Sequence, residues 1–153
     1  MNRFLLLFLV LFVTTKTNSQ PQYFNLKPME GYFLNDEVPL KKGLNFFVIS
    51  NREKFIKHFG LINKSNAPNF DYNHIIVMAL PPSKMESKIA FLPKAARAGN
   101  YIEVYCEIEK KKHSVPYTTY PIVVATIPKY FSVTKVNFYN NENKKLLESV
   151  QIK

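Results

Sequence analysis

The strict alternation of side chains over residues 101–109 constrains the fold of this chain more than any other feature of the sequence. Four apolar side chains share one side of that segment: Ile102, Val104, Cys106 and Ile108. Tyrosine and glutamate side chains occupy the other side. An alternation with a period of two residues is typical of an antiparallel strand that buries one face and exposes the other. The chain therefore needs a sheet with a core on one side.

Further apolar segments are short and lie between turn-forming residues, so they also predict strands. We expect strands over residues 32–34, 44–49, 89–92 and 120–127, and a pair of strands over 133–139 and 146–152 joined by a polar turn. Residues 74–80 are apolar on both faces, which predicts a strand in the middle of a sheet that is covered on both sides. Residues 61–72 and 110–116 are polar and read as a loop and a connection.

One helix is expected, over about residues 51–59. The segment Ser50-Asn51-Arg52-Glu53 matches a capping box, in which the serine would begin the helix, and Gly60 would end it. With one helix and about seven strands joined by short turns, the sequence predicts an α+β fold: a mainly antiparallel sheet with one short helix packed on it. Residues 44–153 would form this single domain, after an irregular lead-in over 20–43 that contains several prolines.

The first nineteen residues read as a secretory signal peptide. A short positive start at Arg3 is followed by ten apolar residues and a small-residue cleavage site at Thr17-Asn18-Ser19. Ten apolar residues are too few to span a membrane as a helix. We therefore expect the product to be exported, periplasmic or secreted, with no membrane span after cleavage.

Charge and cysteine content narrow the classes of protein. The whole chain carries a formal charge of +10, and cleavage would remove Arg3 and Lys16 and leave +8. Its one cysteine cannot form an internal disulfide, so stability must come from the apolar core. A basic chain could bind nucleic acid, but an exported protein rarely meets it and the lysine runs lack an aromatic nucleic-acid motif, so we expect no nucleic-acid partner.

The residues that could carry chemistry do not form an active-site pattern. The histidines His58, His74 and His113 lack the spacing of paired metal ligands. Cys106 lies on the apolar side of its strand, where a nucleophilic thiol would be buried. The sequence contains no serine-nucleophile motif and no glycine-rich phosphate loop. We therefore predict no catalytic residues, no metal site and no cofactor.

Tyrosines and lysines are the candidate binding residues. Tyr101 and Tyr105 share the exposed face of their strand, and Tyr117 and Tyr120 lie in the proline-flanked segment 116–121. Tyrosine suits recognition surfaces because it offers a large apolar ring with a polar tip, although its preference for strands also explains such positions. A basic patch is expected at a turn, with an anionic surface as its ligand or solubility as its only role: Lys110, Lys111 and Lys112.

The order of several elements resembles a known family. It is carried by the helix end Lys57-His58-Phe59-Gly60, the strand 74–80, the segment Gly99-Asn100-Tyr101 and the strand that begins Thr119-Tyr120-Pro121. Over about residues 48–130 the chain is similar to the C-terminal domain of PrcB, the small exported subunit that supports a secreted protease complex. The family tends to have a Thr-Gly-Gly-Tyr-like turn where this chain has Ala98-Gly99-Asn100-Tyr101. The resemblance implies a non-catalytic partner or scaffold role.

The sequence thus favours an exported, non-enzymatic binding or scaffold domain whose partner is another exported protein or envelope component. Two alternatives remain open. One is a small secreted hydrolase or protease inhibitor, which would need a concave site that brings together at least two of His74, His113, Asp71 and Glu103. The other is electrostatic binding to an anionic cell-surface polymer.

Overall fold

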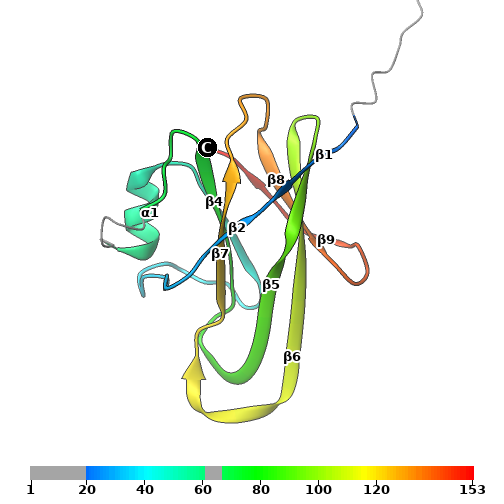
Figure 1. Cartoon of the computed structure of the whole chain (residues 1–153). Helices are drawn as coiled ribbons and strands as arrows, with labels where there is room; N and C mark the ends of the chain where they lie inside the picture. Colours follow the sequence, from blue (N-terminus) through cyan, green and yellow to red (C-terminus); the bar gives the residue numbers. More distant parts are fainter. Residues whose placement is uncertain (1–19, 61–66) are drawn as a thin grey trace, which may run out of the picture.

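The computed structural model describes residues 20–60 and 67–153. The expected signal peptide and residues 61–66 of the expected loop lie outside these residues. The described chain folds into two facing sheets with one helix on the outside of the smaller sheet (Figure 1). One sheet has five strands and the other has four.

The chain forms nine strands and one helix within the described residues. They are β1 Gln22–Asn25, β2 Lys27–Met29, β3 Asn45–Ile49, α1 Arg52–Phe59, β4 Asn73–Ala79, β5 Ser83–Ala98, β6 Tyr101–Thr119, β7 Ile122–Pro128, β8 Lys135–Asn140 and β9 Leu146–Gln151. The five-stranded sheet has the order β1-β5-β6-β8-β9, and the four-stranded sheet has the order β2-β7-β4-β3. The expectation of a mainly antiparallel strand fold with one short helix is confirmed, but the described residues form two sheets and nine strands rather than one sheet of about seven. One pair, β6 with β8, is parallel.

The strand β4 supports both layers of the core, as its apolar pattern predicted. It lies inside the four-stranded sheet, between β7 and β3. Ile76 and Met78 point into the core between the sheets, whereas Ile75 and Val77 pack under the helix. Neither face of a strand in this position is exposed to solvent, so its sequence does not alternate between apolar and polar residues.

The lead-in is more regular than expected. Residues 22–25 form β1 and residues 27–29 form β2. The expected strand at 32–34 is wrong, since residues 32–34 are not in a strand. β1 pairs with β5 in one sheet and β2 pairs with β7 in the other, so the chain changes sheets at the buried Leu26. Pro28 is tolerated because β2 is at the edge of its sheet.

The helix begins one residue later than the capping box predicted. Asn51 is the N-cap, and its side-chain oxygen accepts a hydrogen bond from the Lys54 backbone N–H at 2.9 Å. The Ser50 hydroxyl donates instead to the Lys153 carbonyl. Phe55 and Phe59 bury the inner face of α1, and Gly60 ends it with a φ of 75°. The helix therefore packs on the sheet as expected.

Two strands extend beyond the rest of the sandwich. β1 pairs with β5 only from Lys94 to Arg97, and β8 pairs with β6 only from Tyr101 to Cys106. At the far end of this pair, residues 83–88 of β5 and 109–119 of β6 form a two-stranded extension, which we call the arm (Figure 1). The expected connection at 110–116 is therefore wrong, because these residues continue β6 along the arm.

Candidate functional site

The structure separates the four candidate tyrosines into two groups. Tyr101 and Tyr105 lie half-buried on the outer face of the five-stranded sheet, whereas Tyr117 and Tyr120 are 62% and 59% exposed at the far end of β6 and just after it. A ligand that covers one group need not touch the other.

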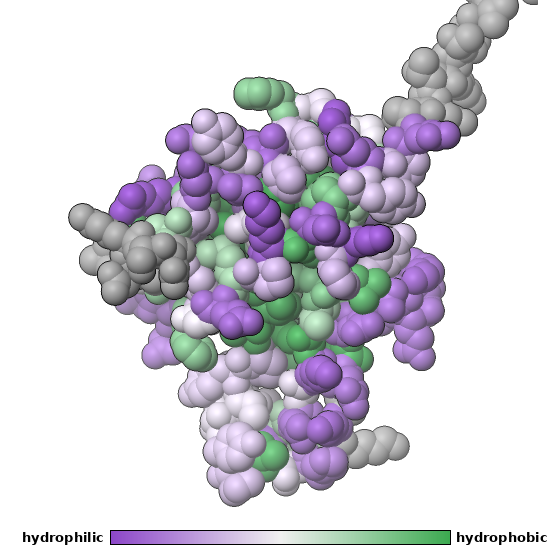
Figure 2. Space-filling view, in the orientation of Figure 1, coloured by the Kyte–Doolittle hydropathy of each residue, from purple (hydrophilic) through white to green (hydrophobic). Residues whose placement is uncertain are grey.

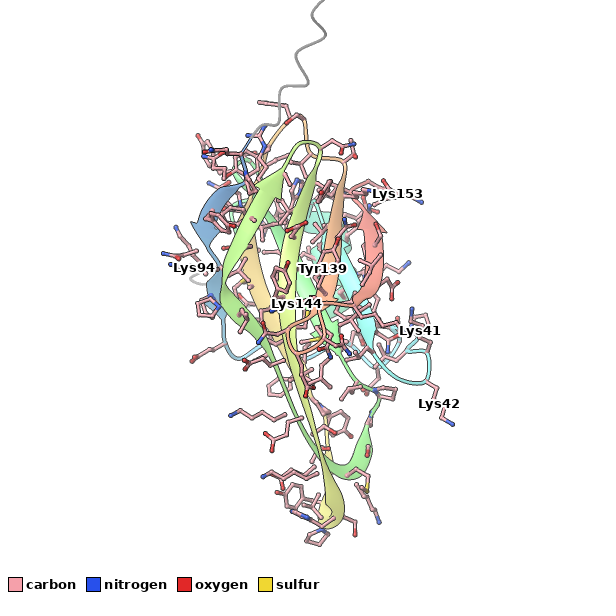
Figure 3. The ribbon with its side chains drawn as sticks, turned by 90° about the vertical axis from the view of Figure 1, so that its right-hand side faces the viewer. Lys41, Lys42, Lys94, Tyr139, Lys144 and Lys153 are labelled. Atoms are coloured by element: carbon pink, nitrogen blue, oxygen red, sulfur yellow. The ribbon has the colours of Figure 1, made fainter. Side chains whose placement is uncertain are left out.

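On the outer sheet face, tyrosine rings already contact other side chains of this chain. Tyr105 stacks on Tyr139 with 5.6 Å between ring centroids, and Lys144 Nζ lies 5.0 Å from the Tyr105 ring. Lys135 Nζ lies 5.8 Å from the Tyr101 ring. Figure 3 looks onto this face and shows Tyr139 near its middle with Lys144 close by. Burial raises the pKa of Tyr105, and the negative charge of Glu103 raises it further by a smaller amount.

At the other surface, Tyr120 lines a pocket of about 350 Å³. Three segments form its walls: residues from the loop 33–40, residues 79–82 at the end of β4 and just after it, and residues 120–122 at the start of β7 and just before it. The ends of β4 and β7 meet here because Ala79 pairs with Ile122. Ligand pockets in proteins typically begin at about this volume and are mostly apolar with a few polar groups.

Backbone hydrogen bonds hold the pocket walls in place. The Leu80 N–H donates to the Pro121 carbonyl at 3.0 Å, which joins the two inner walls. In the outer wall, the Asn35 N–H donates to the His58 carbonyl at 2.7 Å, and the Val38 N–H donates to the Asn35 carbonyl at 2.9 Å. The loop is therefore attached to the end of α1.

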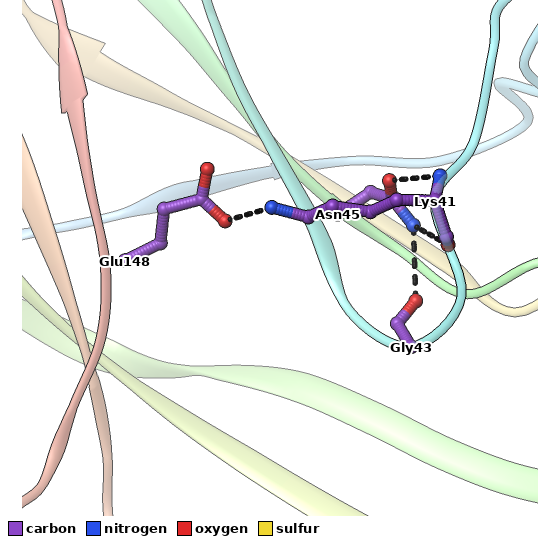
Figure 4. Close-up of polar contacts among 4 residues, drawn as sticks. All are labelled: Lys41, Gly43, Asn45 and Glu148. Carbon is purple, nitrogen blue, oxygen red and sulfur yellow. Dashed lines mark hydrogen bonds and ion pairs between the residues drawn. The ribbon is translucent and has the colours of Figure 1, made fainter.

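Asn45 anchors the far end of the same loop. Its amide nitrogen donates to the carbonyls of Lys41 and Gly43 at 3.0 and 2.9 Å, and its side-chain oxygen accepts from the Lys41 N–H at 2.9 Å (Figure 4). Lys41 Nζ in turn contacts the Glu148 carboxylate at 2.7 Å. Gly43 has a φ of 93°, a conformation that favours glycine. These contacts close the turn between the pocket wall and β3.

Two of the side chains that line the pocket are exposed aromatic residues. Phe33 is 70% exposed and Tyr120 is 59% exposed, and both line it. Tyr117 and Met85 are exposed on the arm, three residues in sequence from the lining residues Tyr120 and Pro82. The Thr119 hydroxyl donates to the carbonyls of Ser83 and Met85 and so joins the two strands of the arm at this point. On the face in Figure 2, hydrophobic residues gather over the middle of the molecule, above the projecting arm.

The predicted basic patch lies on the arm. Lys111 Nζ contacts the Glu86 carboxylate at 2.6 Å, and His113 Nε2 lies 3.6 Å from the other oxygen of Glu86. The hydrogen bond from Lys111 lowers the pKa of Glu86 and raises that of Lys111. The side chains of Lys110 and Lys112 lie outside the described part of the structure. Lys111 is therefore paired within the chain.

Two buried groups with potential chemistry lie inside the sandwich. Cys106 is fully buried, and burial raises the pKa of its thiol to about 12. His74 is 3% exposed, and burial together with the charge of Lys129 lowers its pKa to about 4. At neutral pH the thiol is therefore protonated and the imidazole is uncharged.

The groups that a hydrolase would need are distributed over the fold. His74 is buried on β4, Glu103 lies on the outer face of β6, His113 lies beside Glu86 on the arm and Asp71 is in the turn before β4. None of these four side chains lines the pocket beside Tyr120 or three further pockets among the described residues. The described residues also hold no group of three or more His, Cys, Asp or Glu side chains placed for a metal ion.

Comparisons of the chain with family models, with curated proteins and with solved structures found no match. In the part of the chain that the structure describes, no helix has the length and hydrophobicity that a membrane span requires.

The sequence identifies Tyr120 as a candidate binding residue but does not reveal the pocket that it lines. The pocket needs Phe33 and Pro39 from the lead-in beside Pro81 and Pro121, which are far away in the sequence. The only sequence signal was the set of prolines that interrupts each of these segments. Prolines mark chain ends and turns, but they do not show which turns meet in space.

Proposed function

We propose that this chain is an exported, non-enzymatic binding domain whose partner is another exported protein or an envelope component. One observation carries the proposal: the exposed rings of Phe33 and Tyr120 line an apolar pocket at one end of the sandwich. Exposed aromatic side chains around a pocket are typical of interaction sites, because their burial in a complex releases water from a large apolar area.

The proposed role is to support assembly of a secreted or envelope complex, as the resemblance to the C-terminal domain of PrcB implies. The arm suits this role since it extends the contact area beyond the sandwich and carries the exposed Tyr117. The buried state of Cys106 and His74 also favours binding over catalysis, as neither side chain is open to a substrate.

Crosslinking in native secreted and envelope fractions tests the proposal. We expect the purified protein to capture a defined partner, and Tyr120→Ala to reduce capture without changing the unfolding transition. Phe131→Ala is the matched control, because Phe131 is a fully exposed aromatic residue beyond the opposite end of β7. Capture of no defined partner, or equal loss with both variants, would contradict the proposal.

The outer face of the five-stranded sheet is the second candidate contact, as Tyr101 and Tyr105 lie on it. Tyr105→Ala distinguishes the two surfaces. If the partner binds on the sheet face, Tyr105→Ala reduces capture and Tyr120→Ala does not.

Attachment to an anionic polymer is favoured by the two lysines on this same face, Lys135 and Lys144. Binding of this kind falls steeply as salt rises from about 50 to about 200 mM. Retention on an anionic polysaccharide column that does not change with salt would exclude it.

A further inference from the structure

The backbone of the pocket is poorly suited to pair with a strand of a partner. Four prolines contribute to its walls, Pro39, Pro81, Pro82 and Pro121, and proline has no N–H to donate. The N–H of Leu80 is already bonded to the Pro121 carbonyl. Strand addition relies on main-chain donors and acceptors, so it does not fit these walls. A ligand here must be held by insertion of an apolar group between side chains.

The charge of the pocket differs from that of the whole chain. Asp36 is the one charged residue among the described residues that line it, and the next residue in the loop is Glu37. The chain as a whole is strongly basic, with a formal charge of +10. A cationic ligand would be repelled by most of the surface, whereas the carboxylate of Asp36 would attract it at the mouth of this pocket.

Resting on the proposed function, we propose that the pocket takes an apolar side chain from a partner polypeptide in which a lysine or arginine is adjacent. The apolar side chain would enter between Tyr120 and the loop that holds Phe33, and the cation would lie beside Asp36. The volume of about 350 Å³ admits an apolar side chain with part of its neighbours. Apolar burial would supply the affinity, and the carboxylate would select among segments.

Peptides that share the same apolar centre but differ in the charge of the flanking residues test the inference. The three probes are capped tetrapeptides with a Leu-Phe centre and two flanking residues, which are both lysine, both glutamine or both glutamate. Binding to the purified protein is followed by two-dimensional amide NMR at low salt. We expect the lysine peptide to shift the amides of Ala79, Leu80 and Ile122, and to bind about fivefold more tightly than the glutamate peptide.

Two variants separate the apolar part of the site from the charged part. Asp36→Asn should remove the preference for lysine flanks and leave the binding of the glutamine peptide unchanged. Tyr120→Ala should weaken all three peptides alike. Glu142→Gln and Phe131→Ala are controls, since these exposed residues do not line the pocket.

The inference is overturned if the glutamate peptide binds as tightly as the lysine peptide, if Asp36→Asn leaves the preference intact, or if the shifted amides lie on the arm. The crosslinking experiment tests the proposed function separately. If Tyr120→Ala still abolishes capture, the binding role stands and only the assigned class of ligand is wrong. If the peptides show the expected preference but no protein is captured, the pocket chemistry stands and the partner role fails.

Discussion

Phe46 of β3 stacks on Phe138 of β8 with 4.5 Å between ring centroids and 25° between ring planes. The two residues belong to different sheets, so this contact ties the sheets together across the core. Phe138 also lies against Phe91 of β5, at 6.1 Å between centroids. One aromatic side chain thus links three strands from two sheets.

Phe138→Ala should lower the free energy of unfolding by about 3–5 kcal/mol, because it leaves a cavity at the centre of the core. Urea denaturation monitored by circular dichroism measures the change. Phe131→Ala, which removes a fully exposed ring, should stay within about 0.5 kcal/mol of the parent. Similar losses for the two variants would mean that the sheets are not packed through Phe138.

His74 should make the protein less stable in weak acid. Its pKa falls from 6.5 to about 4 on folding, since burial and Lys129 disfavour the charged ring, and its Nδ1 has no hydrogen-bond partner among the described residues. The unfolded chain therefore takes up a proton at higher pH than the folded chain. Stability should fall as the pH drops from about 6.5 towards 4 and level off below, by up to about 3 kcal/mol.

The check for His74 is urea denaturation across this pH range. His74→Phe should flatten the dependence, whereas His113→Gln on the exposed arm should retain it. The hydrogen bond from Lys111 lowers the pKa of Glu86 from 4.5, so protonation of Glu86 destabilises the fold mainly below pH 4.5. This effect therefore lies largely outside the pH range in which His74 acts. An unchanged slope in His74→Phe would assign the effect to other groups.

Cys106 should resist thiol reagents in the folded protein. Its thiol is fully buried and burial raises its pKa to about 12, so the reactive thiolate is scarce at pH 8. With Ellman's reagent we expect labelling only as fast as the chain unfolds, and rapid labelling of one thiol per chain in concentrated urea. Rapid labelling without urea would show that the thiol is open to solvent.

Asn45→Ala should destabilise the loop that forms the outer wall of the pocket. The change removes three hydrogen bonds and leaves the Lys41 N–H and the carbonyls of Lys41 and Gly43 without this partner. The expected loss is about 1–3 kcal/mol in the free energy of unfolding, with faster amide exchange over residues 38–45. Asn25→Ala on the exposed edge strand β1 is the control, and an equal loss there would contradict the anchoring role.

Local patterns in the sequence predicted most elements but not how far they extend. The alternation at 101–109 predicted the middle of β6, and the two-faced apolar run predicted β4 as an interior strand. The same patterns failed along the arm. There β5 and β6 pair only with each other, so neither face is covered by a core and residues 110–116 carry no alternation to mark them as strand.

The sequence by itself determined which side chains must be buried, since the period of the apolar residues assigns Ile102, Val104 and Cys106 to one face and burial follows from their hydrophobicity. Only the tertiary structure decided which segments meet. It placed β1 and β2 in different sheets, stacked Tyr105 on Tyr139 and assembled the pocket from the lead-in, the end of β4 and the start of β7. These are contacts between distant parts of the chain, and hydrophobic burial specifies how much surface is covered without specifying by which segment.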